Sequence, residues 1–188
     1  MRYAALGWPV TPSCTGIHGR MRCVGQDRHV SPGADWRAEV TTEPAAVAEL
    51  WRVRPAYGVI ARAGRTFGVL DISGLRWTDC VSVLAVAGVV VPLARQVIPR
   101  RRGVDLEQMF AIVAPADSAA ASSIYAETAR GSMWARHEDM PVPLPGAARG
   151  GHVVWAQAPT GAPLSQASAV VRVLAPLLDP RRCRGAQG

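Results

Sequence analysis

Short β-rich runs alternate with helical segments along this chain, and that alternation constrains its fold more than any other feature. It contains no internal repeat, and no linker separates two halves. The sequence therefore predicts one mixed domain over residues 1–180, followed by a basic tail at residues 181–188. The expected strands are residues 8–10, 57–61, 66–72, 89–91, 108–114 and 152–157, and the expected helices are residues 77–87, 119–128 and the segments that contain Leu50 and Leu174.

Size and composition place the chain among globular proteins. Its 188 residues are 49% hydrophobic and 19% charged, far from the composition of disordered chains. The longest apolar run, residues 81–93, is interrupted by Ser82, Gly88 and Pro92 and is too short to span a bilayer. The N-terminus lacks the pattern of a secretory signal. We therefore expect a cytoplasmic protein without membrane contact, in which cysteines are thiols or metal ligands rather than disulfides.

The positive charge of the chain has two interpretations. The formal charge is +7 and all 21 basic residues are Arg, as the codon usage of a GC-rich genome produces. In one interpretation, some of these Arg side chains contact nucleic acid beside Trp rings that stack on bases. In the other, the Arg residues are solvated surface charge and the Trp residues belong to the core. The candidates are Arg65, Arg100, Arg101 and Arg102, with Trp51, Trp77 and Trp134 for stacking.

A turn-rich segment at residues 11–36 contains four residues that commonly bind metals. Cys14, His18, Cys23 and His29 form the pattern C-x3-H-x4-C-x5-H within a loop that shows no sustained helical or strand period. Tetrahedral zinc held by two thiolates and two imidazoles would contribute folding energy to such a loop directly. The alternative is a plain surface loop without metal.

The acidic residues offer one candidate catalytic position at the end of an expected strand. Asp71 follows the apolar residues 67–70, where metal-dependent nucleotidyl transferases place a carboxylate. Two-metal chemistry requires several converging acidic ligands, and the residue two positions on, on the same strand face, is Ser73. Glu138 and Asp139 are the densest acidic pair elsewhere. The alternatives are a solvated Asp71 at a turn, and a solvated loop at the acidic pair.

Several enzyme classes are excluded by the absence of their motifs. The sequence contains no Gly-x-Gly-x-x-Gly or Walker phosphate loop, no Gly-x-Ser-x-Gly elbow and no His-Glu-x-x-His helix. Cys80 and Cys183 have no nearby His in the sequence that would indicate a nucleophile. Dinucleotide-dependent, serine-hydrolase and zincin mechanisms are therefore not expected.

The order of the segments resembles the N-terminal domain of bifunctional DNA primase/polymerases, the prim-pol branch of the archaeo-eukaryotic primase superfamily. The resemblance extends over residues 3–73 and continues in a closing segment near residue 150. The segments that carry it are YAALGWPV at 3–10, ADW at 34–36, TEP at 42–44, YGVI at 57–60, GVLDI at 68–72, PLP at 143–145, GG at 150–151 and VW at 154–155. Together with the composition, they also resemble small stand-alone members from GC-rich actinobacteria.

The resemblance implies a fold and a set of catalytic positions. The implied fold is an α+β domain with an RRM-like, mainly antiparallel sheet flanked by helices. The Asp-x-Asp metal motif of the family would fall on Asp71 and Ser73, so its second carboxylate is missing. The nucleotide-binding His would fall near Met109, and the third acidic ligand would be Glu138 or Asp139.

These substitutions indicate a catalytically degraded relative of the family. We expect a non-catalytic nucleic-acid-binding or regulatory module whose partners are single-stranded DNA or a replication protein. The alternative is a residual metal-dependent primase or polymerase that uses Asp71 with Glu138 or Asp139. Mg²⁺ or Mn²⁺ would be a cofactor only in that alternative.

Overall fold

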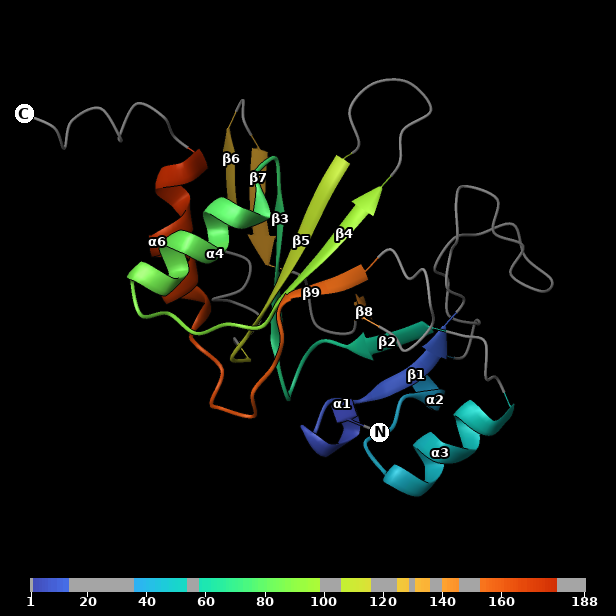
Figure 1. Cartoon of the computed structure of the whole chain (residues 1–188). Coiled ribbons are helices and arrows are strands. Elements are labelled where there is room, and N and C mark those ends of the chain that lie inside the picture. Colours follow the sequence, from blue (N-terminus) through green and yellow to red (C-terminus); the bar gives the residue numbers. More distant parts are fainter. Residues whose placement is uncertain are drawn as a thin grey trace, which may run out of the picture.

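A computed structural model describes residues 2–13, 36–53, 58–98, 106–115, 125–128, 131–135, 140–145 and 153–178 of the chain. Within this part, the strands form two antiparallel sheets (Figure 1). The three-stranded sheet has the order β1-β2-β8 and contains β1 (Val10–Ser13), β2 (Gly58–Arg62) and β8 (Pro141–Leu144). The six-stranded sheet has the order β6-β7-β3-β5-β4-β9 and contains β3 (Gly68–Ser73), β4 (Leu93–Ile98), β5 (Leu106–Val113), β6 (Tyr125–Thr128), β7 (Gly131–Ala135) and β9 (Val153–Gln157).

The described helices fall into two groups at opposite ends of the molecule (Figure 1). Helices α4 (Trp77–Val86) and α6 (Ala167–Leu178) pack together against one face of the six-stranded sheet. The other three are α1 (Arg2–Ala5), α2 (Trp36–Glu39) and α3 (Pro44–Val53), and they lie near β1. Among the described helices, none is long and apolar enough to cross a membrane.

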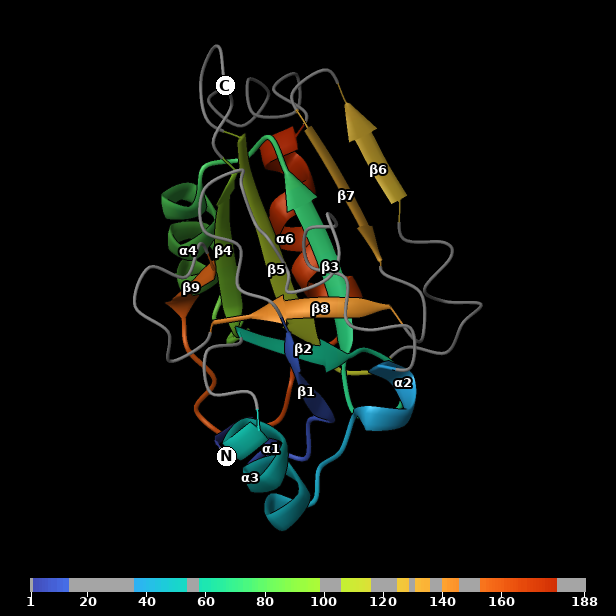
Figure 2. The ribbon, with the colours of Figure 1, turned by 90° about the vertical axis from the view of Figure 1, so that its right-hand side faces the viewer.

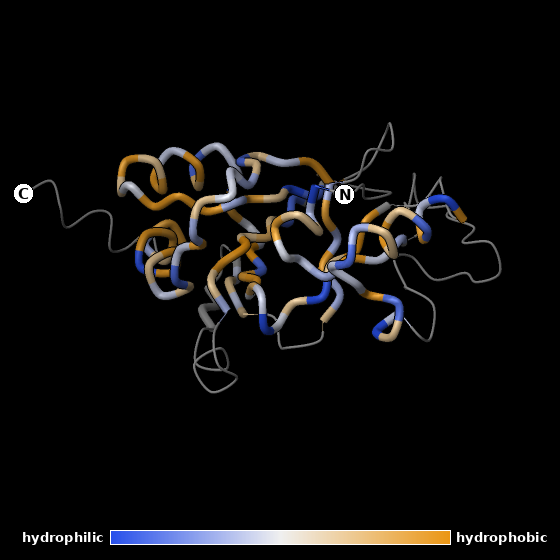
Figure 3. Tube along the Cα trace, turned by 90° about the horizontal axis from the view of Figure 1, so that it is seen from below, coloured by the Kyte–Doolittle hydropathy of each residue, from blue (hydrophilic) through white to orange (hydrophobic). Residues whose placement is uncertain are grey.

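The helix-covered face of the six-stranded sheet forms the first of two hydrophobic cores. Alternate strand residues such as Leu70, Ile72 and Met109 meet Leu84 of α4 and Leu174 of α6, and all five side chains are fully buried. Figure 3 shows hydrophobic and hydrophilic residues along the helices at the C-terminal side of the molecule, as expected of helices with one buried face. Burial of these apolar side chains stabilises the packing of the helices on the sheet.

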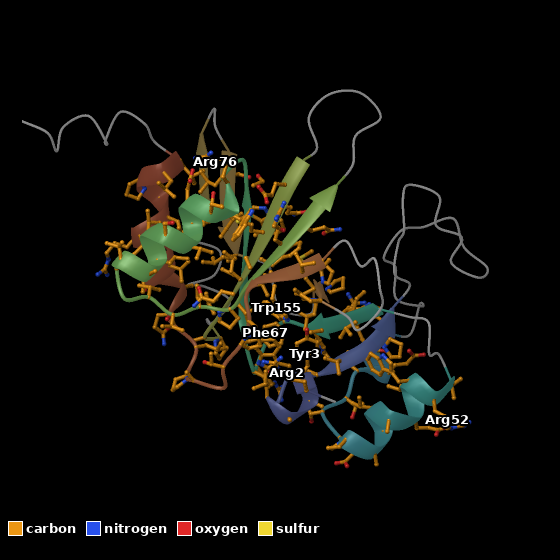
Figure 4. All side chains as sticks on the ribbon, viewed as in Figure 1. Arg2, Tyr3, Arg52, Phe67, Arg76 and Trp155 are labelled. Carbon is orange, nitrogen blue, oxygen red and sulfur yellow. The ribbon has the colours of Figure 1, made fainter. Side chains whose placement is uncertain are left out.

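The second core lies where the N-terminal elements and the three-stranded sheet meet the other face of the six-stranded sheet. Its centre is aromatic: the Tyr3 and Trp8 rings are stacked with centroids 5.8 Å apart, and the Trp8 and Phe67 centroids are 5.0 Å apart. The indole Nε1 of Trp155 donates to the Tyr3 hydroxyl at 2.9 Å, and the Tyr3 hydroxyl donates to the carbonyl of Pro145 (Figure 4). These contacts connect the N-terminus to segments about 150 residues later, since Tyr3 and Trp155 are 152 positions apart.

Much of the expected organisation is confirmed. The α+β class and the antiparallel pairing are correct, although the strands are divided between two sheets. Helix α4 matches the segment expected at residues 77–87, and it ends where Gly88 adopts a positive φ of 66°. Pro44 begins α3, and the Thr41 hydroxyl accepts a hydrogen bond from the Glu43 amide.

The structure corrects the expected secondary structure in three places. Residues 11–13, expected in the turn-rich segment, belong to β1. Residues 125–128 form β6 instead of the end of a helix. Residues 89–91 are not a strand, and the strand that follows α4 is β4, which begins at Leu93. The reason is tertiary: β4 pairs with β5 on one side and β9 on the other, which buries Leu93 and Ala94 completely.

Candidate functional site

The strand β3 positions the predicted catalytic residue near the centre of the six-stranded sheet. Because successive strand side chains point to opposite faces, Leu70 and Ile72 enter the helix-covered core, and Val69, Asp71 and Ser73 lie on the other face. β3 is paired on both sides, with β5 and with β7. The carboxylate of Asp71 is therefore held on a rigid, doubly paired strand, and its residue is only 1% exposed.

A neighbouring strand supplies a hydrogen-bond donor to the buried carboxylate. The side-chain amide Nε2 of Gln108, on β5, donates to Asp71 Oδ1 at 2.7 Å. Gln108 lies opposite Ser73 in the β3–β5 register, so the hydrogen bond runs diagonally across the two strands. Burying a carboxylate without donors is strongly unfavourable, and this amide offsets part of that penalty.

The position where a second carboxylate was sought has a neutral hydrogen bond instead. The Ser73 and Ser132 hydroxyl oxygens are 2.9 Å apart, and the two residues lie directly opposite each other on β3 and β7. Both side chains are partly exposed. A hydroxyl pair is uncharged at neutral pH, so this position does not add the negative charge that a divalent cation requires.

These residues belong to a longer alignment across the sheet. In the strand registers Gln96 faces Gln108, Gln108 faces Ser73, and Ser73 faces Ser132. We call these four residues the polar row. All four side chains are partly exposed. On β6 the backbone register continues the alignment with Glu127 opposite Ser132.

The three-stranded sheet covers a different part of the same face. In Figure 2, β2 and β8 cross in front of the six-stranded sheet, and the end of β3 that carries Ser73 extends beyond them. Two residues along the same strands, and therefore on the same face, the register joins Ala94, Phe110 and Asp71, and these residues are at most 1% exposed. The boundary between buried and accessible side chains therefore falls between Asp71 and Ser73.

Charged groups on the helix-covered face lie at its edge. Arg95 of β4 forms an ion pair with Glu107 of β5, and the Arg95 guanidinium carbon lies 5.4 Å from the centroid of the Trp77 ring. Cys80 of α4 is fully buried nearby. Burial raises the pKa of its thiol to about 12, with smaller contributions from the negative charges of Asp79 and Glu107. Cys80 is thus a protonated core residue at neutral pH.

The residues of the described part do not fit a two-metal site. Among the described side chains of β3, β4, β5 and β7, Asp71 is the only carboxylate on the face of the polar row. No group of three His, Cys, Asp or Glu residues within the described ranges could hold a metal ion. A hollow of about 190 Å³ lies elsewhere, beside Leu6, Val90 and Leu164, and its lining includes none of the polar row.

The structure corrects the predicted position of the nucleotide-binding residue on β5. Met109, the expected counterpart of the nucleotide-binding His, is fully buried in the helix-covered core. Gln108, one residue earlier, lies on the same sheet face as Asp71 and donates the hydrogen bond to it. The cause is the register of β5, since a shift of one residue reverses the face on which a strand side chain lies.

The other predicted site residues either lie apart from one another in the structure or lie outside the described residues. Arg65 is exposed in the turn between β2 and β3, at the opposite end of β3 from Ser73. Trp51 packs on the second core, and Trp134 is partly exposed on β7, opposite Asp71 in the register. The candidates that lie outside the described residues are Glu138, Asp139, Arg100, Arg101 and Arg102, and the zinc candidates Cys14, His18, Cys23 and His29.

Sequence reasoning missed Gln96, Gln108 and Ser132 as members of one surface. The segments that carry them, LARQVI, LEQMFAIV and GSMWA, do not alternate strictly between apolar and polar residues, so the sequence gives no decisive signal for the face on which each residue lies. Nothing local in the sequence indicates that these strands are neighbours of β3 either. The hydrogen bonds of the site join residues 37 and 59 positions apart.

Comparison with known proteins gives one result. The family model for the N-terminal domain of bifunctional DNA primase/polymerases matches residues 1–185. No curated protein and no solved structure matches the chain. The match spans both sheets and all the described helices, and it includes the strand that carries Asp71.

Proposed function

Because the chain belongs to the family of N-terminal domains of bifunctional DNA primase/polymerases, we propose that it is a catalytically degraded member. In this proposal the domain binds single-stranded nucleic acid in the cytoplasm, alone or beside a replication protein, and does not extend it. The proposal has two parts, the loss of nucleotidyl transfer and the retention of binding. Each part has its own physical support and its own experiment.

The observation that carries the loss of transfer is the environment of Asp71. A two-metal mechanism requires several acidic ligands around ions roughly 3.5–4 Å apart, which neutralise the triphosphate as charge develops. Here the carboxylate is 1% exposed and accepts a hydrogen bond from Gln108, and the residue two positions on is Ser73, which is bonded to Ser132. The described side chains therefore favour a structural role for Asp71 over metal binding.

The support for binding is the charge of the chain. A net charge of +7 attracts a polyanion at long range. In the sequence, Arg100, Arg101 and Arg102 lie between β4 and β5, the strands that carry Gln96 and Gln108. Proteins that bind single strands combine cationic side chains, which contact the backbone phosphates, with aromatic side chains on which bases stack.

A primer-synthesis assay tests the loss of transfer. Purified protein is incubated with a single-stranded template, nucleoside triphosphates and either Mg²⁺ or Mn²⁺, and products are separated on a denaturing gel. We expect neither primer synthesis nor extension of an annealed primer. Template-dependent incorporation by the wild-type protein that disappears in Asp71→Ala would overturn this part of the proposal.

Fluorescence anisotropy with a labelled oligonucleotide tests binding. Affinity should fall steeply with salt, because each neutralised phosphate on a single strand contributes a log–log slope of about −0.7. Replacing Arg100, Arg101 and Arg102 together by Ala should flatten that slope by roughly two units. Absence of binding at about 50 mM salt, or a slope that the triple substitution leaves unchanged, would contradict the proposal.

A residual metal-dependent primase or polymerase is the second candidate function, and one observation favours it. The β6–β7 register places the acidic residue Glu127 opposite Ser132, in line with the polar row. In that case, activity should be lost in both Asp71→Ala and Glu127→Ala. Activity in Mn²⁺ that survives both substitutions would contradict this candidate site.

A further inference from the structure

We propose that the polar row, Gln96, Gln108, Ser73 and Ser132, recognises bases of a single-stranded nucleic acid through neutral hydrogen bonds and without a metal ion. This inference rests on the proposed binding function and specifies which surface reads the ligand. The four residues come from four adjacent strands, β4, β5, β3 and β7, and lie opposite one another in the registers. With neighbouring strands about 4.8 Å apart, the row is about 14 Å long.

The chemistry of the row suits base edges better than phosphates. A Gln amide and a Ser hydroxyl can each donate and accept hydrogen bonds, and neither changes charge near neutral pH. Base edges present mixed donors and acceptors, whereas phosphate oxygens only accept and are bound most strongly by cations. A row without charge therefore contributes selectivity among bases and little salt dependence.

Accessibility distinguishes the row from its neighbours on the same strands. Gln96, Gln108, Ser73 and Ser132 are partly exposed, whereas Phe110 and Asp71, two residues along the same strands, are at most 1% exposed. The buried side belongs to the second core, where Val142 and Leu144 of β8 pack. The second core therefore closes the row on that side, and the three-stranded sheet limits how far a ligand can enter there.

An aromatic ring lies next to the row. Trp134 is partly exposed on β7, two residues after Ser132 and therefore on the same face of the strand. Stacking of a base on an aromatic side chain is sequence-tolerant, so it supplies affinity, and the neighbouring amides and hydroxyls supply discrimination. This combination of stacking and neutral hydrogen bonding does not use a carboxylate–metal pair.

The test measures base preference by anisotropy in EDTA, with labelled single-stranded homopolymers of each DNA base and with the RNA equivalents. Two variants alter the row: Gln96→Ala, and the double variant Ser73→Ala with Ser132→Ala, which removes both partners of one hydrogen bond and leaves no unpaired group. The matched controls are Gln166→Ala and Ser82→Ala, which remove the same side chains from exposed positions away from the row. Circular dichroism melting verifies that each variant is folded.

We expect each row variant to weaken binding of the preferred homopolymer by about 3–10-fold, the effect of one or two neutral hydrogen bonds, and to reduce the preference among bases. The slope of affinity against salt should stay as in the wild type, and the controls should bind normally. Row variants that bind like wild type with the same base preference would overturn the inference and leave the proposed binding function intact. Binding that EDTA abolishes would also overturn it, and absence of binding by the wild type would remove both proposals.

Discussion

The two faces of the six-stranded sheet are built from the same strands and have different tasks. On the helix-covered face, Ile72 of β3 and Met133 of β7 are fully buried beneath α4 and α6. On the other face, Ser73 and Ser132, their neighbours in the chain, form a partly exposed hydroxyl pair. Because strand side chains alternate, one face buries apolar residues beneath the helices, and the part of the other face beyond the second core carries polar groups.

Ile72 and Ser73 are adjacent residues of β3 on opposite faces of the sheet, and substitution of Ile72 should have the largest effect on stability. Ile72→Ala removes buried atoms from the packed core and should lower the free energy of unfolding by about 2–5 kcal/mol. Ser73→Ala, one residue later, should lower it by less than about 1 kcal/mol, because the hydroxyl pair is partly exposed. Urea denaturation of the two variants measures both values. Similar losses would show that the two faces contribute equally to stability.

The next effect concerns Asp71, the only buried carboxylate among the described residues on the face of the polar row. Asp71→Ala leaves the Gln108 amide without its acceptor and should lower the free energy of unfolding by about 1–3 kcal/mol. Asp71→Asn keeps an acceptor oxygen of nearly the same shape and should recover most of that loss. Chemical denaturation of both variants is the measurement. An Asn variant as unstable as the Ala variant would show that the negative charge, rather than the hydrogen bond, stabilises the fold.

A smaller effect on stability is expected at the ion pair between Arg95 and Glu107, which lies on the helix-covered face. Arg95→Ala removes the ion pair with Glu107 and the contact with the Trp77 ring, and should lower the free energy of unfolding by about 1–2 kcal/mol. A double-mutant cycle with Glu107→Gln isolates the pair from the ring contact. A coupling energy near zero would place the pair with exposed surface ion pairs, despite side chains that are only 32% and 24% exposed.

The smallest effect at neutral pH concerns Cys80, a fully buried residue of the helix-covered core. Cys80→Ala should lower the free energy of unfolding by about 1 kcal/mol at pH 7, the value of one small buried apolar group. Burial raises the thiol pKa from its usual 9.0 to about 12, so the protonated thiol stabilises the fold fully below about pH 9 and progressively less as pH rises through the folded value.

The pH dependence of that variant has a definite sign. The wild type should lose stability above about pH 9 more steeply than Cys80→Ala, so the difference between them should shrink at about pH 10. Urea denaturation midpoints of the wild type and Cys80→Ala at pH 7 and at about pH 10 measure this change in the stability difference. An iodoacetamide reaction that is slow in the native protein and fast in urea would support the buried thiol, and equal rates would contradict it.

Local sequence was sufficient for the elements whose determinants are local. Helix α4 was expected at residues 77–87, and the structure places the helix there, with Gly88 at a positive φ directly after its last residues. The alternation in β3 correctly assigned Asp71 and Ser73 to one face. The predictions for the segments that form β6 and β4 were wrong because these short segments have no decisive period. Pairing with neighbouring strands determines their conformation.

The sequence by itself determined the class of the fold, the family and the absence of a second carboxylate at Ser73, because each depends on residue type and on local spacing. Only the tertiary structure decided that Gln108 rather than Met109 donates a hydrogen bond to Asp71. It also decided that Gln96 and Ser132 complete the polar row with Gln108 and Ser73. Strand partners and register are set by the simultaneous packing of both sheet faces across tens of residues of chain. Local periodicity fixes the face of a side chain but contains no information about which strand will lie beside it.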